Sequence, residues 1–98
     1  MSIDLVMLLE AVVDEPSFVA FLEALSDDFA MSCEIEAEEP SAPYGPLALG
    51  WENGSVDAVL ERAAAWATDT RDNPSLNPLG QTPWRRCAEI IFAGKYYE

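Results

Sequence analysis

The chain has 98 residues and a formal net charge of −13 at pH 7, with 50% hydrophobic and 10% aromatic residues. This length suffices for a single domain with one core, and the apolar content excludes a disordered acidic tail. The negative charge disfavours direct binding of nucleic acids, phosphates and anionic membranes, because it repels them.

Residues 2–29 predict two helices that pack as a hairpin. In the first, Ser2 is the expected N-cap, Asp4 lies in the first turn, and apolar residues recur every three or four positions: Ile3, Leu5, Leu8, Leu9 and Val12. Residues 14–16, Asp-Glu-Pro, then predict the end of the first helix and the start of a second, since proline fits the first turn of a helix. The second helix has an apolar stripe (Phe18, Phe21, Leu22, Leu25 and Phe29) and a wet face (Glu23, Asp27 and Asp28).

Residues 31–50 lack a helical period and predict a long acidic loop. Three prolines and Gly45 in this segment favour a loop or an extended arm. The alternation of residues from Cys33 to Glu36 leaves a short edge strand as the alternative.

Two further helices are predicted in the C-terminal part. The third begins near Ser55, has Asp57 in its first turn, and has an expected buried side of Val56, Val59, Leu60, Ala63, Ala64 and Trp66. The last has Thr82 as N-cap, Pro83 at its first position, Gly94 as a left-handed stop, and an apolar face of Trp84, Cys87, Ala88 and Ile91. The expected fold is mostly α: one domain over residues 1–98, a bundle of about four helices with a long Pro-rich acidic loop.

The second half of the chain contains a set of short motifs: Trp51-Glu52-Asn53, Ala65-Trp66, Pro83-Trp84 with Ala88, and Gly94-Lys95-Tyr96-Tyr97-Glu98. Together they resemble a small bacterial domain family of unknown function, whose members end in a Gly-Lys-x-Tyr-Glu motif soon after a Trp-led helix. The resemblance covers roughly residues 15 to 98. It implies a compact, mostly helical protein and carries no established activity, substrate or catalytic residue. The N-terminal apolar helix and the Pro-rich acidic loop stand apart from it as features of this member.

The negative charge belongs to one part of the molecule. Residues 1–61 contain 14 Asp or Glu and no Lys, Arg or His, whereas the remainder has five basic and four acidic residues. A concentrated negative field attracts cationic partners and speeds their association, although acidic surfaces also serve solubility alone. The candidate contact residues are Asp27, Asp28, Glu34, Glu36, Glu38 and Glu39, with Tyr44 and Trp51 as possible anchors.

These features favour a protein-binding module whose partner is a basic protein, such as a nuclease toxin. Immunity proteins and mimics of nucleic acid act in this way, by occupying the Lys and Arg side chains that hold phosphates. The alternative is a housekeeping or regulatory domain that forms a homodimer through the first helix. Trp66 and Trp84 are expected in the core and Trp51 partly exposed.

No enzymatic activity is expected, because the chain has no histidine and therefore no Ser–His or Cys–His pair. No catalytic residue, metal ligand or cofactor is assigned. The cluster Glu34, Glu36, Glu38 and Glu39 does not match the spacing of a calcium loop, and solvated acids are the preferred interpretation. Cys33 and Cys87 are expected to stay reduced in a cytoplasmic protein that has neither a secretion signal nor a membrane span.

The basic residues of the last predicted helix are expected to act within the protein. Arg85 and Arg86 should pair with acids of the N-terminal part and so offset some of its repulsion. Lys95 should balance the carbonyl end of the helix, and Tyr96 and Tyr97 should fold back onto the bundle.

Overall fold

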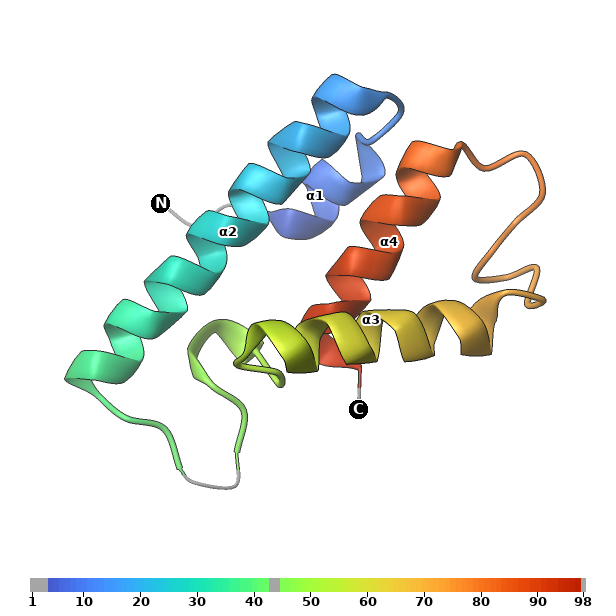
Figure 1. Ribbon diagram of the computed structural model, residues 1–98. Coiled ribbons are helices and arrows are strands. Elements are labelled where there is room, and N and C mark those ends of the chain that lie inside the picture. Colours follow the sequence, from blue (N-terminus) through green and yellow to red (C-terminus); the bar gives the residue numbers. More distant parts are fainter. Residues whose placement is uncertain (1–3, 43–44, 98) are drawn as a thin grey trace.

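The computed structural model describes residues 4–42 and 45–97, which fold into four α-helices and one short 3₁₀ turn (Figure 1). The helices are α1 (Leu5–Glu10), α2 (Glu15–Glu38), α3 (Val56–Thr70) and α4 (Pro83–Tyr96), and the turn is η1 (Ala48–Gly50). No strand occurs within the described ranges. The expected mostly α fold of about four helices is therefore confirmed.

Capping side chains set the beginnings of α1 and α2. The carboxylate of Asp4 accepts hydrogen bonds from the backbone N–H groups of Val6 and Met7 at 3.1 and 3.2 Å, so Asp4 is the N-cap instead of a first-turn residue. The expected cap, Ser2, lies outside the described residues. Asp14 and Ser17 form a reciprocal capping box at the start of α2, and Pro16 follows in the first turn as predicted.

Helix α2 is longer than the sequence pattern suggested. It continues to Glu38, so the prediction of a loop or an edge strand over residues 31–38 was wrong. The first helix breaker is Pro40, and the preceding residues are mostly compatible with a helix. A tertiary contact supports the extension, because the hydroxyl of buried Ser32 donates to the carbonyl of Ala48 at 2.7 Å. Only residues 39–55 connect α2 to α3.

Helix α4 also passes its expected end and continues to Tyr96. Gly94 is therefore a helical residue, and the prediction of a left-handed stop there was wrong. Its role is close approach: a Cβ atom at Gly94 would lie 2.7 Å from the carbonyl oxygen of Val59 in α3. Glycine lets α3 and α4 come into direct contact at this point.

The buried face of α3 is narrower than predicted. Ala63 and Thr70 are buried, but Val56 and Leu60 are 77% and 56% exposed, and Ala64 is exposed as well. The expectation that these last three are buried was wrong, because α3 packs on α4 and not closely on α2. Figure 1 shows α2 and α3 diverging, with α4 between them.

The core is formed by α1, α2, α4 and the segment before α3. Its buried apolar members are Leu5, Leu9, Val12, Phe21, Ala24, Leu25, Trp51 and Ala88. α1 packs against α2, as the predicted hairpin requires. Trp84 lies at the surface against Phe18, with ring centroids 5.7 Å apart, so its assignment to the core was wrong. Cys33 and Cys87 are free thiols, both exposed.

Candidate functional site

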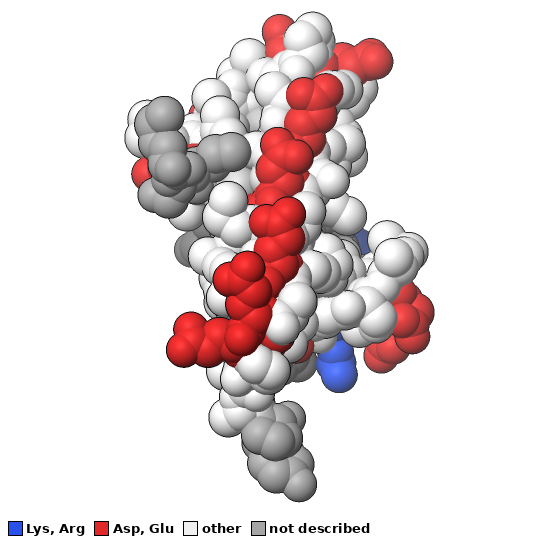
Figure 2. Space-filling model, turned by 90° about the vertical axis from the view of Figure 1, so that its left-hand side faces the viewer, with Lys and Arg blue, Asp and Glu red and all other residues white. Residues whose placement is uncertain are grey.

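One side of α2 carries a row of exposed carboxylates, which we call the acidic face: Glu23, Asp27, Glu34 and Glu38. Spacings of four, seven and four residues place them within about 60° of one another around a helix and along about 22 Å of its length. Figure 2 shows such a row of acidic side chains running along the molecule. Neither ion pair between described residues involves these side chains, so their charges face the solvent.

Asp28 lies about 100° around α2 from Asp27, on the side that packs against Lys95 and Trp51, although it was predicted on the wet face. Its Oδ2 accepts hydrogen bonds from the Nζ of Lys95 at 2.7 Å and from the indole N–H of Trp51 at 2.8 Å. Lys95 and Trp51 are each only 3% exposed, and the Nζ of Lys95 lies 5.2 Å from the Trp51 ring centroid. The expectation of a partly exposed Trp51 was therefore wrong. The Asp28 carboxylate and the Trp51 indole N–H, both predicted to contact a partner, are instead bonded within the protein.

Two of the motifs in the second half of the sequence, Trp51-Glu52-Asn53 and Gly94-Lys95, meet around the Asp28–Lys95 ion pair. The side-chain amide of Asn53 donates to the carbonyls of Gly94 and Tyr97 at 2.9 and 3.1 Å. The backbone N–H of Glu52 donates to the carbonyl of Lys95 at 2.9 Å. The Trp-Glu-Asn and Gly-Lys motifs thus join the segment before α3 to the end of α4. Lys95 pairs with Asp28 instead of facing the carbonyl end of α4, contrary to the prediction.

Glu36 fastens the connection that follows α2. Its carboxylate accepts hydrogen bonds from the hydroxyl of Ser41, from the Ser41 N–H at 2.8 Å and from the Ala48 N–H at 2.7 Å. These bonds, above all that of the Ser41 hydroxyl, lower the pKa of Glu36 below its ordinary value. Glu36 is thus occupied within the chain, Glu39 is exposed just beyond the end of α2, and Tyr44 lies outside the described residues.

The structure thus brings together three predicted contact residues, Asp27, Glu34 and Glu38, and adds Glu23. The signal was present in the sequence, since two i, i+4 pairs of acids are in phase on one helix. It was missed because a loop was expected from residue 31, and a loop places Glu34 and Glu38 in no fixed relation to Asp27.

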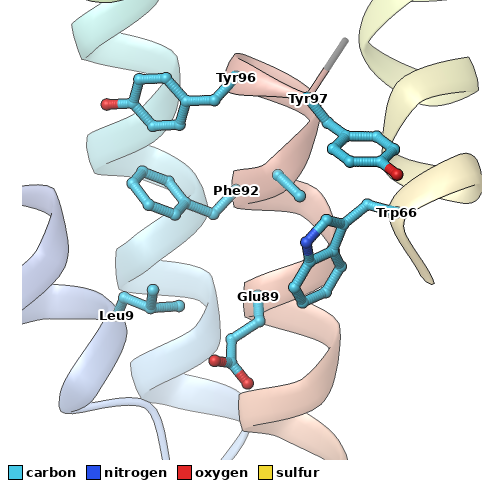
Figure 3. Close-up of a pocket in the computed structure, with 7 residues that line it drawn as sticks. Leu9, Trp66, Glu89, Phe92, Tyr96 and Tyr97 are labelled. Atoms are coloured by element: carbon cyan, nitrogen blue, oxygen red, sulfur yellow. The ribbon is translucent and has the colours of Figure 1, made fainter. Parts of the chain in front are cut away.

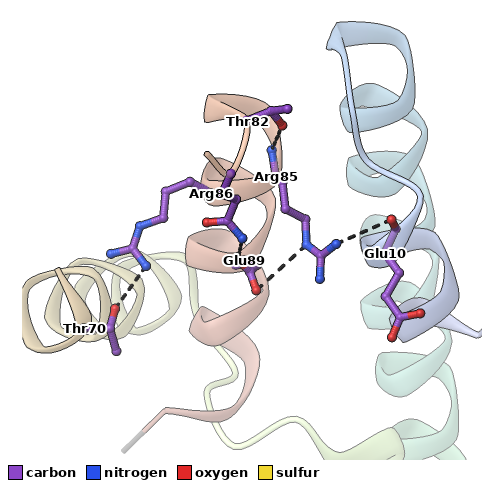
Figure 4. A network of polar contacts seen from close by, with 7 residues as sticks. Glu10, Thr70, Thr82, Arg85, Arg86 and Glu89 are labelled. Atoms are coloured by element: carbon purple, nitrogen blue, oxygen red, sulfur yellow. Dashed lines mark hydrogen bonds and ion pairs between the residues drawn. The ribbon is translucent and has the colours of Figure 1, made fainter. Parts of the chain in front are cut away.

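The arginines do not neutralise the acidic face (Figure 4). Arg85 donates to the backbone carbonyl of Glu10 at 3.4 Å and lies 3.9 Å from the carboxylate of Glu89 on its own helix. Arg86 donates to the Thr70 hydroxyl at 3.1 Å, at the end of α3. The prediction that both pair with carboxylates of the N-terminal part was wrong, because α4 brings them to the carbonyl ends of α1 and α3.

A hollow of about 540 Å³ lies along α4 and is lined by Leu9, Trp66, Glu89, Phe92, Ala93, Tyr96 and Tyr97 (Figure 3). Two of its polar groups are engaged: Glu89 accepts from the amide of Gln81, and the Tyr97 hydroxyl donates to Asp69. The Asp69 hydrogen bond raises the pKa of Tyr97. The lining supplies one carboxylate, from Glu89, and two phenols, from Tyr96 and Tyr97.

The described part of the chain has neither a metal-binding cluster nor a helix suited to a membrane. No group of three or more His, Cys, Asp or Glu side chains is arranged to hold a metal ion there. None of the described helices has the length and apolar character needed to cross a membrane.

The fold and surface together define a small all-α domain with an acidic face on its longest helix. A family model described as "Family of unknown function (DUF7660)" matches residues 15–98, and the chain belongs to this family. No curated protein and no solved structure matches the chain. The matched range begins at α2, so the acidic face and the Asp28–Lys95 pair lie within it and α1 lies outside it.

Proposed function

We propose that this protein is an acidic protein-binding module that neutralises or sequesters a basic partner which handles nucleic acid. A bacterial immunity protein against a nuclease toxin and a mimic of nucleic acid are the two forms of this function. The acidic face is the observation that carries the proposal. It is a row of solvent-facing carboxylates whose relative positions are fixed by one continuous helix, α2.

The mechanism is competition for a cationic surface. A protein that holds phosphates presents Lys and Arg, and a line of carboxylates can pair with the same side chains. Long-range attraction speeds the encounter at low salt, whereas ions screen it beyond a distance of about 8 Å at physiological ionic strength. Occupation of the Lys and Arg side chains then prevents the partner from binding nucleic acid.

The test uses the full chain as bait at low salt, followed by measurements with the purified basic partner that it captures. The protein should displace a fluorescent DNA duplex from that partner and should not itself bind the duplex. The double variant Asp27→Asn/Glu34→Gln should weaken the complex by at least about tenfold, since close charge pairs across an interface are lost.

The matched control is Glu10→Gln/Asp72→Asn, which removes the same two negative charges from exposed sites off the acidic face. It should change the affinity by no more than about twofold, because only long-range steering is affected. Equal weakening by both variants would mean that net charge alone acts. Failure to capture a basic protein, or capture without displacement of DNA, contradicts the proposal.

A second candidate function, regulation through a homodimer, is favoured by one observation on α1. Leu5 and Leu9 are buried in the protein's own core, but Val6 and Met7 between them are exposed. A homodimer through α1 would bury these two side chains. Sedimentation of Val6→Gln/Met7→Gln tests it: a parent dimer that becomes a folded monomer supports this candidate. Deletion of α1 is a poorer test, because it removes core residues.

A further inference from the structure

An open apolar groove of about 270 Å³ lies between α2 and α3. Its lining residues are Leu22, Leu25, Ser26, Phe29, Trp51, Ser55, Val56, Val59, Leu60 and Ile91. Ile91 of α4 and buried Trp51 belong to the core-facing part of the groove. Leu22 on one wall and Val56 and Leu60 on the other are 36%, 77% and 56% exposed.

The exposed apolar side chains of the groove form an elongated surface along its two walls. Val56 and Leu60 are one helical turn apart and lie on the same side of α3. Leu22 stands on the facing wall, one turn before Ser26 and two turns before Phe29. Large exposed apolar side chains that share one groove mark an interaction site, whereas isolated ones do not.

Carboxylates follow the groove on both helices. On α2, Glu23 and Asp27 come directly after the groove residues Leu22 and Ser26, and on α3, Asp57 and Glu61 come directly after Val56 and Leu60. A step of one residue turns about 100° around a helix, and in both helices this step leads away from the buried side. All four acids are exposed. The groove is therefore an apolar channel with acidic rims.

Charge selects the occupant of this channel. We propose that the groove binds an amphipathic basic helix of the partner, with its apolar side on Leu22, Val56 and Leu60 and its Lys and Arg side chains toward the rims. The acidic α2 then contributes to both recognition elements, the acidic face and the rim. This inference rests on the proposed function and names the structural element that the partner inserts. A second copy of the chain is disfavoured, because each copy carries a net charge of −13.

Binding of synthetic peptides to the full chain tests the groove. The first peptide has leucines at i, i+3, i+4 and i+7 spacing and lysines elsewhere, and the second has the same composition with the leucine spacing destroyed. Fluorescence anisotropy of each labelled peptide gives the affinity, and backbone amide NMR shifts map the site. The first peptide should bind at least about tenfold more tightly than the second and should shift Val56, Leu60 and Trp51.

The discriminating variant is Leu22→Gln/Leu60→Gln, at positions that are 36% and 56% exposed. It should weaken the first peptide by at least about tenfold, the effect of removing two apolar contacts. The control, Leu76→Gln/Leu79→Gln, makes the same kind of change at two exposed leucines outside the groove lining and should change the affinity by less than about twofold. Circular dichroism and urea unfolding check that both variants keep the parent fold.

Three results would overturn the inference: no binding of the amphipathic peptide, equal affinity for both peptides, or equal affinity of the groove and control variants. A parent dimer that Leu22→Gln/Leu60→Gln converts to monomers also overturns it, since the occupant is then a second copy. The proposed function fails separately. It fails if Asp27→Asn/Glu34→Gln leaves the affinity for the captured basic protein unchanged, whatever the peptides do.

Discussion

Asp27 and Asp28 are adjacent in the sequence and have opposite environments on α2. Asp27 belongs to the acidic face, is exposed, and has no cation beside it among the described residues. Asp28 is partly buried, with its side chain 16% exposed, and it pairs with Lys95 and accepts a hydrogen bond from the indole of Trp51. One step along a helix changes the direction of a side chain by about 100°, and this step separates a solvent-facing charge from one that is paired within the protein.

The difference shows which part of the net charge is available to a partner. The sole lysine of the chain is used inside the protein, and Arg85 and Arg86 hold carbonyl groups at the ends of other helices. Internal pairing therefore stabilises the junction of α2, α4 and the segment before α3, and leaves the outer side of α2 uncompensated. The following predictions test this division, from the largest expected effect to the smallest.

Lys95→Met should cause the largest loss of stability. The substitution leaves the Asp28 carboxylate without its cation near a buried tryptophan, and breaking such a pair costs about 3 kcal/mol or more. The free energy of unfolding from urea denaturation measures the loss. Arg71→Met, at an exposed arginine, should change it by less than about 0.5 kcal/mol.

A double-mutant cycle separates the charge pair from simple packing. Lys95→Met combined with Asp28→Asn should recover a substantial part of the loss, because no unpaired charge remains in the interior. If Lys95→Met is as stable as the parent, the pair is not what joins α2 to α4, and the division between recognition and structural charges is wrong.

Gly94→Ala should cause the next largest loss. The added Cβ would meet the Val59 carbonyl oxygen at 2.7 Å, and backbone cannot move aside as a flexible side chain can. Overpacking of this kind costs about 1 to 3 kcal/mol, enough to exceed the better helix propensity of alanine. Gly45→Ala is the control, since a Cβ there would meet its nearest atom at 3.8 Å. Equal stability of the two variants would show that α3 and α4 separate without cost.

The beginnings of α2 and α4 could be predicted from the sequence because local side chains determine them. Asp14 with Pro16, and Thr82 with Pro83, mark the starts of α2 and α4 through bonds within one turn. The ends depended on distant contacts. α2 is supported past residue 31 by the bond from Ser32 to Ala48, and Gly94 stays helical where α4 meets Val59.

The candidate site was predictable only where its residues follow the period of a helix. Asp28 lies seven residues after buried Phe21, so the helical period already placed it on the buried side of α2. Trp51 carried no such signal, because it lies outside a regular helix and its burial depends on Asp28 and Lys95 arriving from elsewhere. Which acids form the acidic face followed only once the true length of α2 was known.

Glu36→Gln should weaken the attachment of Ser41 and Ala48 to α2 in a pH-dependent way. The folded-state pKa of Glu36 is lowered from 4.5, so its stabilising contribution is present above that value and is lost as the pH falls through the folded pKa. The parent should be more stable than Glu36→Gln at pH 7, and the difference should vanish in acid. Urea denaturation from pH 7 to pH 3 measures this difference. A constant difference for Glu36→Gln across this pH range would mean that its charge is not what holds Ser41 and Ala48.

The smallest effect on stability should come from Asp27→Asn/Glu34→Gln, the variant expected to have the largest effect on binding. Removing two like charges from one helix relieves repulsion, so the free energy of unfolding should rise at low salt by no more than about 0.5 kcal/mol. The rise should disappear at high salt, because screening already weakens the repulsion there. Urea denaturation at two ionic strengths measures it, beside Glu10→Gln/Asp72→Asn as the control. A clear loss of stability would mean that these carboxylates support the fold, and the contrast between Asp27 and Asp28 would then no longer separate recognition from structure.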